Sequence, residues 1–170
     1  MGKGISNQMQ PIPDLTAHQV VGALDASGMR FAVVVSRFNQ ELTFELCRSA
    51  TACLLEKGAS SETIDVFQVP GAYEIPAVLE KLAASGRYNA LIALGVVVEG
   101  ETQHAQMIID TTGQTILDIS CRHQLPVINE IVGVRTWEQA EARCLGGKNT
   151  RGWYAAEAAI ETAQLYRQLV

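Results

Sequence analysis

Short apolar runs alternate with longer segments of helical periodicity along most of this chain, and this alternation restricts its fold more than any other feature. The run ALIALGVVV at residues 90–98 carries no polar side chain, and RFAVVV at 30–35 is nearly as apolar. Continuous runs of this kind are typical of strands that are covered on both faces, as in parallel sheets. IDVFQV at 64–69 and VINEIVGV at 127–134 complete a set of four expected strands.

A segment with helix signals follows each of the four expected strands. Leu42, Leu46 and Leu54 share one face of a helix that Gly58 ends, and Pro76 lies near the first turn of the next. Thr136 and Gln139 form a T-x-x-Q capping box, which indicates a helix start. The expected helices cover residues 40–57, 73–86, about 104–123, 137–145 and 152–169.

Four strand–helix units predict a single-domain α/β fold. We expect a three-layer αβα sandwich around a parallel four-stranded sheet in the flavodoxin-like order 2-1-3-4, with right-handed crossovers. Residues 19–24 (QVVGAL) are a candidate for an additional N-terminal edge strand. Residues 1–18 are polar, contain two prolines and are predicted to form a tail or arm, which leaves 19–170 as the domain.

Charge and composition exclude several classes of protein. The net charge is −5 and no Lys/Arg cluster occurs, so neither nucleic acid nor a membrane surface is an expected partner. No apolar stretch is long enough for a membrane span, and the first residues lack the apolar core of a secretory signal. The four cysteines form no CxxC pair, and Cys47 and Cys53 read as buried thiols on a helix rather than as a disulfide or metal site, which predicts a cytoplasmic protein. Motifs for nicotinamide, ATP or metal-dependent hydrolysis are missing, so no cofactor or metal is expected.

Polar and glycine-containing loops follow three of the expected strands at their carboxyl ends, where ligands bind in open α/β sheets. His104 begins a helix, whose dipole favours the neutral imidazole that can accept a proton. It is a candidate general base, although a helix start also favours a polar residue without chemistry. The backbone amides around Gly100–Thr102 are a candidate seat for phosphate or carboxylate.

Four further side chains each allow two interpretations. Phe38 at a strand end either stacks on a planar ring or forms a local apolar plug, and Glu74 either binds a ligand or complements a helix dipole. Arg143 and Arg151 flank Gly146-Gly147 and are either anion ligands or ordinary solvated charges.

Five motifs occur in order between about residues 30 and 168: VVVSRFNQELT, VPGAYEIP, ALGVVVEGETQH, LPVI and EQAEARCLGGKNTRGWYAAEAAIE. In this order and spacing they resemble the lumazine synthase (6,7-dimethyl-8-ribityllumazine synthase) family. The resemblance implies a step of riboflavin biosynthesis without cofactor or metal. In it, 5-amino-6-(D-ribitylamino)uracil condenses with 3,4-dihydroxy-2-butanone 4-phosphate to the lumazine, and phosphate and water are released.

The resemblance also implies a role for each matching residue. Phe38 would stack on the pyrimidine, His104 would shuttle protons, and Arg143 would hold the phosphate as a bidentate fork. The other substrate-binding positions would be Asn39, Ala72, Glu74, Val97, Val98 and Asn129, and the other phosphate-binding positions Gly100, Glu101 and Thr102.

In the family, the helix around Arg143 reaches across from a neighbouring subunit. The resemblance therefore implies self-association into a ring, usually a pentamer, and in some members a shell of sixty subunits. Four positions depart from the family pattern. Glu99 stands where Arg is common, Arg151 where Lys is usual, Asn129 where many members place an aromatic against the ring, and Tyr154 where many place an acid.

Two other functions are compatible with the same motifs. A non-catalytic flavin- or lumazine-binding homologue would keep the pocket without turnover, and Glu99 is the best support for it. A scaffold or container would need assembly alone. His104 and Arg143 argue against both, because binding requires no base and a shell requires no phosphate anchor.

Overall fold

A computed structural model of the chain describes residues 11–100 and 103–169. Glu101 and Thr102, both predicted site residues, lie outside the described residues, as does most of the predicted N-terminal arm. Strands are β1 (Phe31–Ser36), β2 (Ile64–Val69), β3 (Ala90–Val98) and β4 (Val127–Val134), and α-helices are α1 (Gln40–Glu56), α2 (Ile75–Ala84), α3 (His104–His123), α4 (Trp137–Cys144) and α5 (Arg151–Gln168). Short 3₁₀ segments are η1 (Ser61–Thr63), η2 (Ala72–Glu74) and η3 (Gly147–Asn149).

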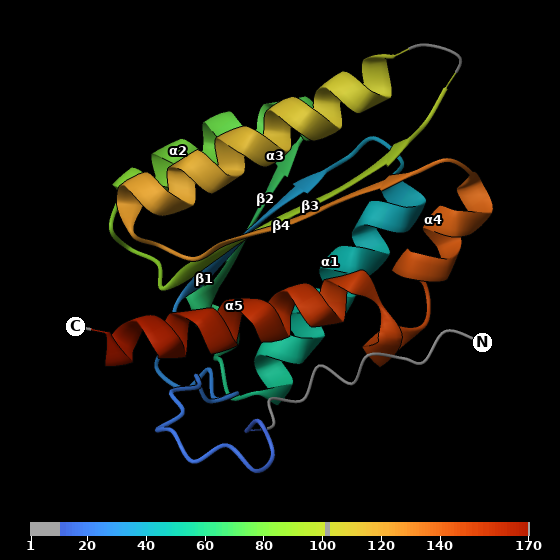
Figure 1. Cartoon of the computed structure of the whole chain (residues 1–170). Helices are drawn as coiled ribbons and strands as arrows, with labels where there is room; N and C mark the ends of the chain where they lie inside the picture. Colours follow the sequence, from blue (N-terminus) through green and yellow to red (C-terminus); the bar gives the residue numbers. More distant parts are fainter. Residues whose placement is uncertain (1–10, 101–102, 170) are drawn as a thin grey trace.

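The four strands form one parallel sheet in the order β2-β1-β3-β4, which confirms the predicted topology. Helices α2 and α3 cover one face of the sheet, and α1, α4 and α5 lie on the other (Figure 1). The chain is therefore a three-layer αβα sandwich, as its alternating pattern predicted.

Side chains of β1 alternate between the two faces and are buried on both. Phe31, Val33 and Val35 pack into the core on the α1/α5 side, while Ala32 and Val34 pack into the core on the α2/α3 side. Successive side chains of a strand point to opposite faces, so a continuous apolar run fits only a strand with helices on both sides. In β3 every residue before Val98 is likewise buried.

The predicted capping box at the start of α4 is present in an altered form. Thr136 accepts a hydrogen bond from the Gln139 backbone N–H, as the motif requires. The Gln139 side chain, however, accepts from the backbone N–H of Arg135 at 3.0 Å, one residue before the cap. The two bonds fix the direction in which the chain leaves β4 and enters α4.

Residues 19–24 form no strand, so the candidate edge strand is not borne out. This segment runs along α5 instead. Gln168 donates to the Val21 carbonyl at 2.9 Å, and a Cβ at Gly22 would overlap the Glu161 carbonyl oxygen. Backbone carbonyls that a sheet edge would use are thus bound by side chains of a helix, and glycine permits the close approach.

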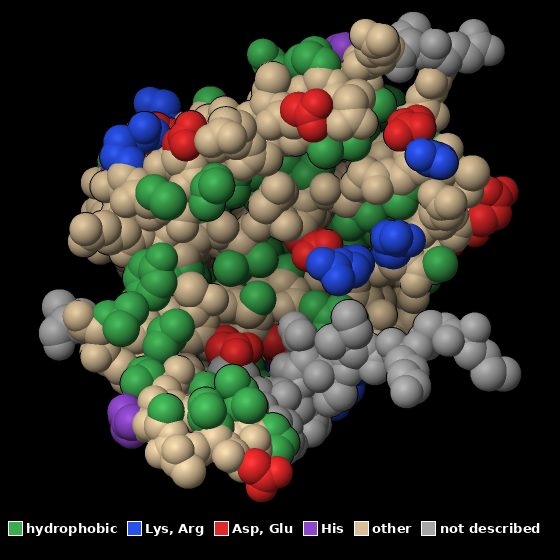
Figure 2. Space-filling model, in the orientation of Figure 1, with side chains coloured by type: hydrophobic (Ala, Val, Ile, Leu, Met, Phe, Trp, Pro, Cys, Tyr) green, Lys and Arg blue, Asp and Glu red, His purple; other side chains and the backbone are tan. Residues whose placement is uncertain are grey.

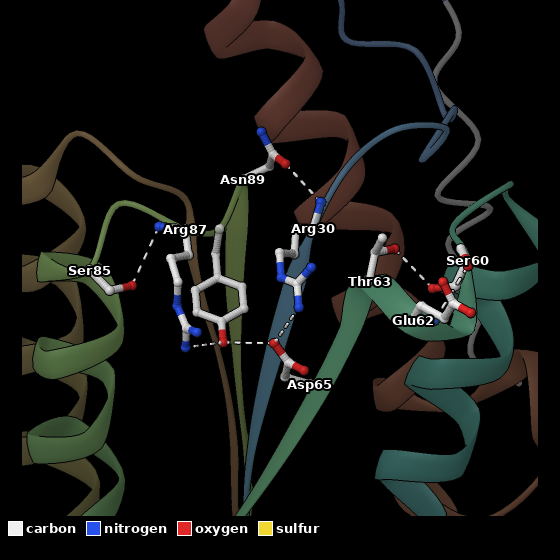
Figure 3. A network of polar contacts seen from close by, with 9 residues as sticks. Arg30, Ser60, Glu62, Thr63, Asp65, Ser85, Arg87 and Asn89 are labelled. Atoms are coloured by element: carbon white, nitrogen blue, oxygen red, sulfur yellow. Dashed lines mark hydrogen bonds and ion pairs between the residues drawn. The ribbon is translucent and has the colours of Figure 1, made fainter.

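A polar network ties together the amino ends of the strands (Figure 3). Asp65 of β2 accepts from the Tyr88 hydroxyl at 2.8 Å and pairs with Arg30 at 3.3 Å, while the Arg30 backbone N–H donates to Asn89. The Tyr88 hydrogen bond is the main cause that lowers the pKa of the Asp65 carboxyl. These groups are occupied with one another, which leaves the opposite end of the sheet for ligands.

The four cysteines are free thiols, as the sequence predicted. Within the described part of the chain, no helix has the length and apolar character required to cross a membrane.

Candidate active site

A cavity of about 510 Å³ lies at the carboxyl ends of the strands. The arrowheads in Figure 1 mark these ends of the strands. Loops after all four strands contribute to it. Eight of the predicted site residues line this one cavity: Phe38, Asn39, Ala72, Glu74, Val97, Val98, Gly100 and His104. The chain order that placed these residues at strand ends therefore also brings them together in space.

The loop after β1 is fastened so that Phe38 stays exposed beside the cavity. The backbone N–H of Phe38 donates to the Pro70 carbonyl at 3.0 Å, and Asn39 has a left-handed backbone with φ of 58°. The Asn39 amide donates to the Val96 carbonyl of β3 at 2.9 Å. Phe38 is 70% exposed although its backbone is fixed from both sides, so its ring is available to a ligand.

Glu74 ends η2 and its carboxylate turns back over the preceding loop. One oxygen, Oε2, accepts from the Gly71 backbone N–H at 2.9 Å. This bond agrees with the interpretation that Glu74 stabilises the start of its own helix. The side chain nevertheless remains exposed and lines the cavity. Its second oxygen is in a position to receive hydrogen bonds from a polar ligand.

His104 is the first residue of α3, as the sequence predicted, and lines the cavity. Glu99 is the first residue of the loop between β3 and α3, and its carboxylate faces a cation. The Glu99 backbone N–H donates to the Val134 carbonyl at 2.8 Å, and its carboxylate lies 4.0 Å from the Arg135 guanidinium. Arg135 thus offsets the charge that Glu99 brings to a loop predicted to bind an anion.

Asn129, Arg143 and Arg151 do not line this cavity. Asn129 lies on β4, an edge strand of the sheet, and Arg143 and Arg151 lie on α4 and α5, the helices that pack against this strand. Asn129 is exposed, and its Oδ1 accepts from the Ile131 backbone N–H. Figure 2 shows basic and acidic side chains gathered over this edge. The structure thus separates these three predicted residues from the other eight within one chain.

The Arg151 guanidinium forms a fork on the buried carboxylate of Glu130. Its Nε and Nη2 donate to Oε1 and Oε2 at 2.7 and 3.1 Å. Burial raises the pKa of Glu130 more than Arg151 and the nearby Arg143 lower it. Two donors of Arg151 are therefore committed to Glu130, which sequence reasoning did not single out because its partner is 21 residues away.

Six lining residues are not among the predicted site residues: Gly71, Tyr73, Val96, Ala105, Ile108 and Trp137. Trp137 carried a usable signal, because it directly follows the cap that ends the loop after β4 and so stands at the ligand end of the sheet. Among the described residues, no three His, Cys, Asp or Glu side chains group as metal ligands.

The cavity lies at the carboxyl end of a parallel sheet and is lined by an aromatic ring, a carboxylate and an imidazole. This combination is typical of an α/β enzyme that acts on a small substrate with a planar ring and polar groups. The chain belongs to the 6,7-dimethyl-8-ribityllumazine synthase family, whose model matches residues 28–167. It is 37% identical over 155 residues to the 6,7-dimethyl-8-ribityllumazine synthase of Chlorobaculum tepidum, which covers 91% of this chain and 100% of that protein. It is 39% identical over 150 residues to the protein of the same name from Chlorobium limicola, covering 88% and 97%.

Proposed function

We propose that this chain catalyses the condensation of 5-amino-6-(D-ribitylamino)uracil with 3,4-dihydroxy-2-butanone 4-phosphate to 6,7-dimethyl-8-ribityllumazine, in riboflavin biosynthesis. The observation that carries the proposal is the convergence of eight predicted site residues on one cavity in a chain of this family. No cofactor is needed for this chemistry, which consists of an addition, an elimination and a cyclisation.

In the proposed mechanism, the cavity holds the pyrimidine while protons move at the other reactant. Phe38 stacks on the ring, and Asn39, Ala72, Glu74 and the backbone of Val97 and Val98 hold the ring and the ribityl hydroxyls. The 5-amino group attacks the ketone and water leaves, phosphate is then eliminated, and the ribitylamino nitrogen closes the second ring with loss of another water. His104 accepts and returns protons during these steps.

The phosphate is proposed to bind at the amides of Gly100, Glu101 and Thr102 and to a guanidinium. Arg143 is that guanidinium, and because it lies outside the cavity of its own chain, we propose that it comes from a second copy. An arrangement in which each copy completes the site of the next forms a ring when the rotation between copies closes. The ring we propose is a pentamer, with a sixty-subunit shell as its larger form, in the cytoplasm.

The test is to mix the purified protein with both substrates and follow the fluorescent lumazine against a control without protein. We expect acceleration above the spontaneous rate, and we expect His104→Ala to lower turnover by roughly 10²-fold or more without reducing it to the spontaneous rate, because positioning alone still assists. A protein that binds lumazine without accelerating its formation would overturn the proposal in favour of a binding homologue.

A further inference from the structure

Trp137 lines the same cavity as Phe38. Phe38 follows β1 and Trp137 follows β4, and these two strands flank β3 in the sheet order. β3 itself contributes Val96, Val97 and Val98 to the cavity. The end of β3 therefore lies between two aromatic side chains, and only one of them was expected from the sequence.

The indole of Trp137 is held in place by its own chain. It is half-buried and packs against the core on the α1/α5 side. Its Nε1–H donates to Oε1 of Glu141, one helical turn further along α4, at 3.2 Å. The Thr136 cap fixes the backbone immediately before it. An aromatic side chain fixed in this way loses little conformational freedom when a ligand arrives.

The chemistry of the cavity favours a flat heterocycle against this indole. Apart from Glu74 and His104, the described lining consists of apolar side chains, aromatic rings, Asn39 and glycine backbone. An indole face offers stacking to a pyrimidine or to a bicyclic lumazine, whereas a small aliphatic phosphate has no ring to stack.

We propose that Trp137 is a second aromatic wall for the heterocyclic ring of substrate and product, and that Glu141 is the residue that positions it. The inference deepens the proposed function and rests on it. Trp137 determines specificity toward the ring-bearing reactant, while Arg143 and the loop amides serve the phosphate.

The kinetic test compares the two substrates in Trp137→Leu, which removes the ring but keeps an apolar side chain. We expect the KM for the aminouracil to rise about tenfold and the KM for the butanone phosphate to stay within about twofold. Trp137→Phe restores most of the loss, Glu141→Ala gives a smaller rise, and Glu141→Gln, which keeps an acceptor, gives none. An unchanged KM for the aminouracil, or an equal rise for both substrates, would overturn the assignment.

Trp153, the second of the two tryptophans, supplies the matched control. It is 6% exposed, bonds to Glu157, and is not among the residues that line the cavity. In the Trp153→Phe variant, Trp137 is the one remaining source of tryptophan fluorescence. The quenching of that fluorescence by acrylamide can therefore be measured with and without added lumazine. We expect lumazine to shield Trp137 at least twofold. Equal quenching in both samples would overturn the inference in a protein that still forms lumazine, whereas loss of the proposed function itself appears as no lumazine formation by the unaltered protein.

Discussion

The four cysteines of the chain differ in their surroundings, and this difference sets their reactivity. Burial raises the pKa of Cys53 to about 12 and those of Cys47 and Cys144 to about 11. Cys121, near the end of α3, is exposed. Because the thiolate is the reactive form, the buried Cys53 and Cys144 are protected both by access and by protonation, and the half-buried Cys47 is protected mainly by protonation.

We therefore expect a disulfide reagent at about pH 8 to titrate one thiol rapidly in the folded protein and all four after denaturation. Cys121→Ser should remove the rapid phase and leave the total at three. A rapid phase of two or more thiols would contradict the burial described for α1 and α4.

Residue roles differ in how far the sequence could predict them. The positions of Phe38 and His104 at the cavity were predictable, because each follows a recognisable strand and the ligand end of a parallel sheet is fixed by topology, while their roles stay predictions. The ion pair of Glu130 with Arg151 was not, because it joins two elements that are adjacent only after α5 has folded back along β4. Trp137 was overlooked since an aromatic at a helix start is usually a core residue.

Among the secondary-structure elements, the close contact of α1 with α5 depends on one glycine. A Cβ at Gly152 would overlap the backbone of Leu46, so the start of α5 lies directly against α1. Gly113, in the middle of α3, is different. Its nearest neighbour would be the Asn129 amide nitrogen at 3.6 Å, an ordinary contact distance.

These two helical glycines make a matched pair of substitutions. Gly152→Ala should destabilise the protein by about 1–3 kcal/mol, since the two helices must separate to admit the methyl group. Gly113→Ala should stabilise it by about 0.5–1 kcal/mol, because alanine loses less backbone entropy in a helix. Denaturant unfolding of both variants measures the difference, and equal effects would refute the close packing of α1 and α5.

The boundaries of the elements were largely predictable, and the one strand predicted wrongly, at residues 19–24, has a definite physical cause. β2, β3 and β4 begin and end at the predicted residues, because their apolar runs are bounded by polar residues, glycine or proline. The segment 19–24 has the same apolar character but lies on α5. Gln168 donates to the Val21 carbonyl of this segment, and Gln164 donates to the carbonyl of Asp25 directly after it. Nothing local distinguishes this segment from a strand, since both partners are about 140 residues away.

At the scale of the whole molecule, the proposed site is divided. His104 lines the cavity, and Arg143, on helix α4, does not. The family resemblance of the sequence already implied this separation, whereas periodicity and spacing did not, because both residues lie in motifs of one chain and only the fold sets their distance apart.

Mixed oligomers test whether Arg143 serves the neighbouring copy. His104→Ala and Arg143→Ala are each expected to be impaired when they assemble alone. In randomly mixed rings, half of the sites keep His104 and half of those face an intact Arg143, so about a quarter of the sites recover. Activity after co-expression should therefore exceed that of either variant. No recovery, in rings shown to contain both variants, would place both residues in the site of one chain.

The strand order also determines how the chain behaves while it is being synthesised. β2, β1 and β3 can assemble once residue 98 has left the ribosome, but the outer edge of β3 is paired only by β4, which begins at Val127. Until then the most apolar strand of the protein presents free backbone groups to other nascent chains, a common route to aggregation. Translation must pass through all of α3 before that edge is closed, so the residues between β3 and β4 set the time for which a newly made chain is exposed.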